Sequence, residues 1–188
     1  MKRIAIFASG SGSNAENIIT YFQNNKKAEV VLVLSNNPNA LVLERAKKLG
    51  VQSLVFNKHQ LNDSNWAVEN LKNLDLIVLA GFLWKFPEHL LENYENKVVN
   101  VHPALLPKYG GKGLYGMYVH EAVVENRETE SGITIHYVNE HYDEGAIIFQ
   151  AKCTITAKDT PSDVAAKIQE LEMRYFQEIV QQILSKNG

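Results

Sequence analysis

Residues 2–22 read KRIAIFASGSGSNAENIITYF, and this stretch decides the fold. Its first seven residues are mostly apolar, its centre is rich in glycine, and its last part places apolar side chains at helical spacing. The order predicts a strand, a glycine loop and a helix. Ser13 and Glu16 have the spacing of a capping box, so we expect the helix to begin at Ser13 or Asn14.

The glycine loop at residues 9–14 indicates an anion site, because the first N–H groups of a helix lack partners and its dipole favours negative charge. The spacing Gly10-x-Gly12-x-x-Ala15 also matches a dinucleotide fingerprint. The next strand, however, ends in Leu-Ser-Asn-Asn, where that fingerprint requires an acidic residue. A Walker-type phosphate loop is set aside, because the Lys followed by Ser or Thr is missing. A plain tight turn is the remaining alternative.

Outward from this unit, strand and helix patterns alternate along the chain. Predicted strands cover Glu29–Ser35, Gln52–Phe56, Asp75–Ala80 and Val98–Val101. Predicted helices cover Asn39–Gly50, closed by Gly50 at its C-terminal cap position, Asp63–Asn73 and Pro87–Asn93. The strands are apolar without alternation, as expected when helices cover both faces of a parallel sheet. The sequence therefore predicts an α/β fold with a doubly wound, mostly parallel sheet and helices on both faces.

The C-terminal third predicts a different arrangement. Residues 131–138 alternate between apolar and polar side chains, and residues 146–155 form a second strand-like run, so we expect an antiparallel hairpin. The turn between them, residues 139–145, is dense in ionisable groups, which is typical of a solvated loop.

A long amphipathic helix is predicted from Pro161 to about Leu184, with Thr160 as its cap. Its apolar stripe contains Val164, Ile168, Leu171, Tyr175, Ile179 and Ile183. A shorter helix is predicted at residues 115–124, after a glycine-rich segment at residues 108–114 that fits either a lid or a linker.

Asn100 and His102 follow an apolar strand pattern and lie two residues apart, so an extended backbone places them on the same side. Pro103 and Pro107 then hold the chain as a stiff loop. A histidine there is a candidate proton donor or acceptor near neutral pH, and turn formation is the plain alternative. Ligands of doubly wound sheets bind at the carboxyl ends of strands. Three such ends carry suggestive residues: Gly10–Asn14, Gly81–Trp84 and Asn100-x-His102.

Composition favours one domain over residues 1–188. The formal charge of −2 gives no broad attraction to nucleic acid or anionic membranes, so an anionic ligand must be held locally. Cys153 is the single cysteine, and the chain enters a strand pattern after Met1 without a signal-peptide core, which predicts a reducing, cytoplasmic setting. No apolar stretch approaches the roughly 18 residues of a membrane span.

From Ile4 to about Phe176 the chain resembles the folate-dependent formyltransferases. The motifs that carry the resemblance are Gly10-Ser11-Gly12-Ser13-Asn14, Leu79-Ala80-Gly81-Phe82, Asn100-x-His102-Pro103-x-Leu105-Leu106-Pro107 and Asp143-x-Gly145. The resemblance implies a Rossmann-like formyltransferase domain whose co-substrate is 10-formyltetrahydrofolate. The N-terminal loop resembles the acceptor-phosphate site of the members that formylate glycinamide ribonucleotide in purine biosynthesis.

The resemblance also implies roles for individual residues. Asn100 and protonated His102 would donate to the oxyanion, His102 would protonate the leaving folate nitrogen, and Asp143 would orient His102 and raise its pKa. Acceptor binding is implied for Gly12, Ser13, Asn14, Pro103, Gln169 and Glu172. Folate binding is implied for Phe82, Leu83, Trp84, Lys85, Phe86, Asn100, Asn139, His141, Tyr142 and Asp143.

Two segments depart from the family pattern. The loop at residues 109–120 is longer and richer in glycine, and the region at residues 57–73 is shorter, so no folate contact is assigned before Leu79. Trp84 stands where a basic residue is common. We expect small-molecule substrates, no metal, and a monomer or homodimer.

Other functions share some of these features. A deformylase and a formyltransferase for methionyl-tRNA share the central motif but need a further domain, for which 188 residues leave no room. A nicotinamide-dependent oxidoreductase would use the glycine loop. A folate- or phosphate-binding module would bind the same ligands without turnover.

Overall fold

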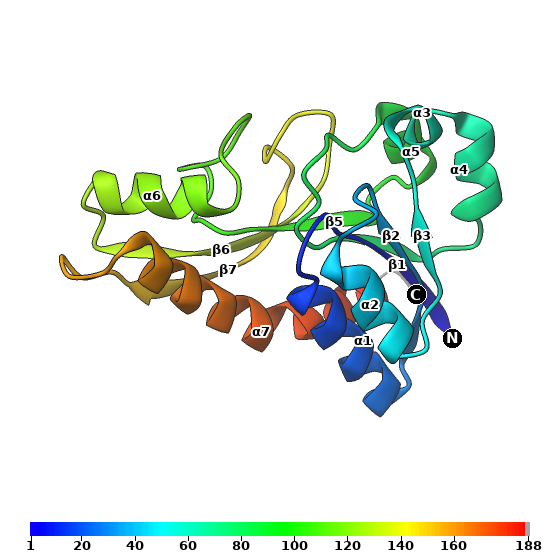
Figure 1. The fold of residues 1–188 in the computed structure, drawn as a ribbon, viewed down its shortest axis with the longest axis horizontal. Helices are drawn as coiled ribbons and strands as arrows, with labels where there is room; N and C mark the ends of the chain where they lie inside the picture. The colour runs from blue at the N-terminus through cyan, green and yellow to red at the C-terminus, as the bar shows by residue number, and fades with distance from the viewer. Residues whose placement is uncertain (187–188) are drawn as a thin grey trace.

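The computed structural model describes residues 1–186, whose strands form one seven-stranded sheet in the order β3-β2-β1-β4-β5-β6-β7 (Figure 1). The strands are β1 Lys2–Phe7, β2 Ala28–Ser35, β3 Ser53–Val55, β4 Leu76–Leu79, β5 Val98–His102, β6 Glu130–Tyr137 and β7 Ile147–Thr154. β1 to β5 are parallel, while β6 pairs antiparallel with β5 and with β7. The predicted doubly wound sheet with a C-terminal antiparallel hairpin is confirmed.

Helices cover both faces of this sheet. They are α1 Ser13–Asn25, α2 Leu41–Lys48, α3 Lys58–Leu61, α4 Ser64–Asn70, α5 Glu88–Asn93, α6 Met117–Glu125 and α7 Pro161–Lys186. Figure 1 shows α1, α2 and α7 on one side of the sheet and α3, α4 and α5 on the other. Among the described residues, no helix combines the length with the apolar character that crossing a bilayer requires.

α1 begins at Ser13, as predicted, but it is not capped in the predicted way. Gly12, at φ 75°, occupies the N-cap position, and no side chain of residues 1–186 caps the helix, so the predicted capping box is wrong. Glu16 forms an ion pair with Arg45 of α2 instead of turning back to the helix start. The left-handed conformation of Gly12 therefore begins the helix.

The helix predicted over residues 63–73 is also shorter than expected. Asp63 caps α4 by accepting a hydrogen bond from the N–H of Asn65, at 2.9 Å. The separate short helix α3 was missed by sequence reasoning. Asn57 caps it in a capping box with Gln60, a signal that the sequence contains.

The strands bury both of their faces. In β1, Ile4 and Ile6 pack into the core beneath α1 and α7, while Ala5 and Phe7 pack into the core beneath α3, α4 and α5. This two-sided burial explains why the strand patterns are apolar without alternation. At the end of β5 only one face is apolar, because Val99 and Val101 join the first core. The opposite face of β5 carries Asn100 and His102.

Thr160 caps the long helix α7, as predicted, and forms a capping box with Asp163. The Thr160 Oγ accepts from the N–H of Asp163 at 3.2 Å, and the Asp163 carboxylate accepts from the N–H of Thr160 at 2.8 Å. Of the predicted stripe, Val164, Ile168, Ile179 and Ile183 are buried. Leu171 and Tyr175 are only half-buried, while Phe176, outside the predicted stripe, is fully buried in the core.

Gly132 gives a test of the packing between β6 and β7. A Cβ added there would overlap the backbone carbonyl of Ala151 in β7, whereas a Cβ at Gly10 would meet no described atom within 4 Å. We expect Gly132→Ala to lower the free energy of unfolding by at least about 1–3 kcal/mol, the usual cost of overpacking. Gly10→Ala should change it little. Urea unfolding of both variants measures this, and equal stabilities would contradict the β6–β7 register.

Candidate active site

A cleft of about 780 Å³ opens at the carboxyl edge of the parallel strands. Its walls come from the glycine loop after β1, the segment after β4, the end of β5, the turn between β6 and β7, and one face of α7. Every residue to which the sequence assigned a role lines this cleft. The topology thus places together segments that are more than 150 residues apart, although it does not test the individual roles.

Asn100 and His102 face the cleft from β5. His102 is 4% exposed, and its Nε2–H donates a hydrogen bond of 2.7 Å to the backbone carbonyl of Tyr109. In the neutral imidazole this bond leaves Nδ1 as the nitrogen with a free lone pair. That Nδ1 faces Asp143, whose Oδ2 lies 3.5 Å away.

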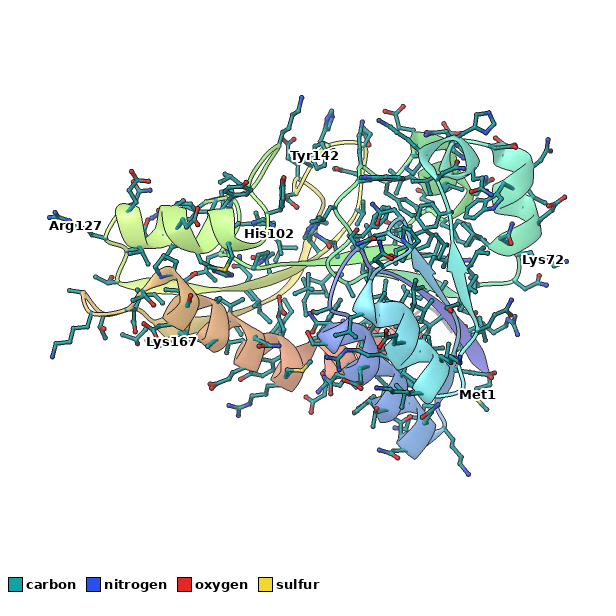
Figure 2. The ribbon with its side chains drawn as sticks, viewed as in Figure 1. Met1, Lys72, His102, Arg127, Tyr142 and Lys167 are labelled. Atoms are coloured by element: carbon teal, nitrogen blue, oxygen red, sulfur yellow. The ribbon has the colours of Figure 1, made fainter. Side chains whose placement is uncertain are left out.

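Asp143 reaches His102 from the turn between β6 and β7, where it adopts φ 57°. Its Oδ2 also accepts the backbone N–H of Gly111 at 3.0 Å, which ties this turn to the glycine-rich loop before α6. Figure 2 shows these two loops rising together on one side of the sheet, with Tyr142 labelled in the first. The expected meeting of Asp143 with His102 is confirmed, and the carboxylate is held by a backbone donor as well.

The electrostatics of this pair differ from the expectation. Burial lowers the pKa of His102 below its ordinary value, and the opposing attraction of Asp143 does not outweigh burial. The predicted net rise in the pKa of His102 is therefore wrong. Burial also opposes the charge of Asp143, but His136, His102 and the N–H of Gly111 together hold its pKa below the ordinary value. The pair is a charged carboxylate beside a neutral imidazole at neutral pH.

Sequence reasoning missed His136 as a site residue. It lies directly opposite Asn100 in the β5–β6 register and is 2% exposed. Its Nε2 is 3.2 Å from the Asn100 Nδ2, and 3.7 Å from the Asp143 Oδ1. The alternation of residues 131–138 placed His136 on the polar face of its strand, but a single sequence does not reveal which residue faces it.

The glycine loop packs closely against α2. A Cβ at Gly12 would overlap Val42, so glycine is required at this position by packing as well as by its positive φ. The Arg45 Nε donates to the Ser11 carbonyl at 2.8 Å, and the Val42 N–H donates to the Gly10 carbonyl at 3.2 Å. These contacts fix the loop, while the first turn of α1 opens onto the cleft.

Beside this loop, α7 contributes a half-buried acid, Glu172. The Asn14 Nδ2 donates to the Glu172 Oε2 at 2.8 Å, while the Asn14 Oδ1 has no partner among the described residues. Burial raises the pKa of Glu172 to about 7, and the bond from Asn14 opposes that rise only in part. Gln169, one turn earlier, is exposed and lines the cleft, and Pro103 lines it directly after β5.

The segment after β4 forms another wall of the cleft. Phe82 and Trp84 are half-buried and make edge-on contacts, with ring centroids 6.4 Å apart. Phe86 is 2% exposed and packs on Phe7, so it supports the wall from within the core. The Leu83 N–H donates to the Ser9 Oγ at 3.0 Å, which joins this segment to the glycine loop.

The remaining predicted residues on this side differ in exposure. Leu83, Lys85, His141 and Tyr142 are exposed, while Asn139 is half-buried. Lys85 pairs with Glu88 at 3.4 Å. Among residues 1–186, no group of three or more His, Cys, Asp or Glu side chains could hold a metal ion.

Comparison with known proteins places the chain among described families. The family model "Formyl transferase" matches residues 2–180. The chain belongs to the formyl transferase family. It is 34% identical over 195 residues to the phosphoribosylglycinamide formyltransferase of Bacillus subtilis, covering 100% of this chain and 97% of that protein. It is 37% identical over 187 residues to the chloroplastic enzyme of that name from Arabidopsis thaliana, covering 95% of this chain and 64% of the relative's length.

Solved structures from this family have the same fold. The phosphoribosylglycinamide formyltransferase of Bacillus halodurans superposes with a TM-score of 0.87 at 34% identity, covering 100% of this chain and 97% of that one. The enzyme of that name from Streptococcus pneumoniae gives a TM-score of 0.84 at 36% identity, covering 97% and 99%. The family, the fold and the placement of the predicted residues in one cleft therefore agree.

Glu172 gives a test of burial in this cleft. With a pKa raised to about 7, its contribution to stability is fully present below the ordinary value of 4.5 and lost as the pH rises through about 7. We therefore expect Glu172→Gln to match the wild type near pH 4.5 and to exceed its free energy of unfolding by up to about 3 kcal/mol at pH 8.

Urea unfolding at several pH values between 4.5 and 8 measures this difference. Glu170→Gln is the matched control, because Glu170 is exposed on the same helix. A stability difference between wild type and Glu172→Gln that does not depend on pH would contradict the burial of the acid.

Proposed function

We propose that this chain transfers the formyl group of 10-formyltetrahydrofolate to the amine of 5-phosphoribosylglycinamide, a step of purine biosynthesis. The observation that carries the proposal is the meeting of Asn100, His102 and Asp143 in a cleft that the glycine loop enters from one end. Membership of the formyl transferase family and relatives named phosphoribosylglycinamide formyltransferase support it. The chain spans 64% of the length of the chloroplastic relative from Arabidopsis thaliana.

The acceptor's phosphate fits the start of α1. The helix contributes free N–H groups and the positive end of its dipole, and Ser13 and Asn14 add a hydroxyl and an amide. A chain with a net charge of −2 needs such a local site to hold a phosphate. Glu172 and Gln169 line the same cleft from α7, and the sugar and glycinamide of the acceptor would lie beside them.

The folate fits the other end of the cleft. Phe82 and Trp84 give flat apolar surfaces for the pterin, and the exposed backbone after β4 gives donors and acceptors for its polar edge. Tyr142 and Asn139 close this end from the β6–β7 turn. The two ends meet at Asn100 and His102, so the formyl carbon and the acceptor amine are brought together there.

The chemistry begins when the amine nitrogen forms a bond to the formyl carbon and the carbonyl electron pair moves onto oxygen. Asn100 has an amide N–H that would donate to this oxyanion. The attacking nitrogen must lose a proton, and the free lone pair on the Nδ1 of neutral His102 would accept it. Asp143, 3.5 Å from this nitrogen, stabilises the imidazolium that results.

The second step breaks the bond between the formyl carbon and N10 of the folate. The oxyanion electron pair re-forms the carbonyl, and N10 leaves with the proton that His102 received, directly or through water. His102 ends neutral, so the cycle is balanced in protons. The lowered pKa of His102 suits this order of steps, since the residue must first act as a base.

The first prediction from this mechanism concerns Asp143. Asp143→Asn should cut turnover by roughly 10²–10⁴-fold, the usual effect of losing acid–base assistance. Because the carboxylate raises the pKa of His102 against burial, its removal should also move the acidic limb of the kcat/KM profile to lower pH. The wild-type limb should already lie below the ordinary histidine value of 6.5.

Glu144→Gln is the matched control, since Glu144 is the exposed neighbour in the same turn. The measurement is a pair of pH–rate profiles with glycinamide ribonucleotide and 10-formyltetrahydrofolate. Equal losses in the two variants would mean that the charge of the turn acts diffusely. Wild-type protein that releases formate but no formylated ribonucleotide would replace the transferase proposal with a hydrolase.

The second prediction concerns the folate end. Trp66 and Trp84 both contact Phe56, but only Trp84 lines the cleft. A folate analogue should therefore change the fluorescence of a Trp66→Phe protein, whose remaining tryptophan is Trp84. The Trp84→Phe protein, which keeps Trp66, should respond much less. The reverse pattern would place the folate outside this wall.

A further inference from the structure

His136 is held at both of its ring nitrogens. Its Nδ1 lies 2.8 Å from the backbone carbonyl of Tyr137, and its Nε2 lies 3.2 Å from the Asn100 Nδ2. A carbonyl oxygen only accepts hydrogen bonds, so Nδ1 must carry the proton. In the neutral imidazole Nε2 is then an acceptor, and its partner must be a donor.

This assignment fixes which way the Asn100 amide points. Only the N–H₂ group can face an accepting Nε2, because the amide oxygen would place two lone pairs against each other. The amide is planar, so one N–H bound to His136 leaves the second N–H and Oδ1 in fixed directions. We propose that His136 is a positioning residue, which sets the orientation of the Asn100 amide and so aims its free N–H at the formyl oxygen.

The surroundings of His136 favour this role over a direct catalytic one. His136 is 2% exposed, and β6 places it opposite Asn100 by strand pairing. The other polar group that approaches it, the Asp143 Oδ1, is 3.7 Å from Nε2 and lies beyond hydrogen-bonding distance. The Asn100 amide is thus its one side-chain hydrogen-bond partner among residues 1–186.

The inference rests on the proposed function, because the free N–H of Asn100 is assigned to the oxyanion of formyl transfer. Its kinetic test compares two substitutions. His136→Gln keeps an acceptor that can reach the position of Nε2, whereas His136→Leu keeps comparable bulk and removes the acceptor.

We expect His136→Leu to lower kcat by about 10²-fold, approaching the loss seen when an oxyanion donor is removed. KM for both substrates should change little, because the interaction is made in the transition state. His136→Gln should recover most of the lost turnover. Equal turnover of the two variants, or a loss confined to KM, would overturn the assignment.

A double-mutant cycle separates positioning from general support of the fold. If His136 acts through Asn100, adding His136→Leu to an Asn100→Ala protein should change kcat by less than about threefold. A second full loss of about 10²-fold would mean that His136 acts on the reaction independently of Asn100. Thermal melting of each variant identifies losses that come from unfolding.

An NMR measurement tests the geometry without turnover. The ¹⁵N shifts of the His136 ring in the wild-type protein near pH 7.5 should report a protonated Nδ1 and an unprotonated Nε2. A proton on Nε2, or a charged ring, would require the amide of Asn100 to be reversed and would overturn the proposal. If wild-type protein fails to formylate glycinamide ribonucleotide, the proposed function fails, while this measurement still decides the orientation of Asn100.

Discussion

The antiparallel pairing of β6 with β5 is the constraint on which the site depends. It places His136 opposite Asn100 and Thr134 opposite His102, so four polar side chains share one face of the sheet. The Thr134 Oγ accepts from the Leu106 N–H and donates to the Ala104 carbonyl, which holds the loop after His102 against the same strand. One strand register therefore positions the proposed catalytic residues and the loop that follows them.

Burial and nearby charges have opposite effects on the pKa values in this site, and the larger effect differs between His102 and Asp143. His102 gains one carboxylate at 3.5 Å but loses most of its water, so burial decides and its pKa falls. Asp143 is less deeply buried and has two imidazoles and a backbone N–H around it, so the favourable interactions decide. The same pair thus holds an ionised acid beside a neutral base, the state in which His102 can accept a proton.

Local patterns were enough to predict much of this structure from the sequence. The glycine loop after β1, the shared face of Asn100 and His102, and the C-terminal hairpin follow from periodicity and turn residues. The predictions that failed concerned residues whose partners are distant in the sequence. Glu16 pairs with Arg45 of α2 instead of forming the predicted capping box. His136 is identified as a site residue only by its register with Asn100. The pKa of His102 depended on burial by segments that no local pattern brings together.

At the acceptor end of the cleft, the balance between burial and hydrogen bonding sets the charge of Glu172 beside the proposed anion site. Glu172 is a carboxyl group close to the proposed phosphate position, and an ionised form would repel that ligand. Burial avoids the conflict because a pKa of about 7 leaves a large share of Glu172 protonated at neutral pH. A bound phosphate would favour the protonated form further, so binding of the ribonucleotide above pH 7 would be accompanied by proton uptake. The Oδ1 of Asn14, which has no hydrogen-bond partner among residues 1–186, would then accept the proton of Glu172 after a rotation of its amide.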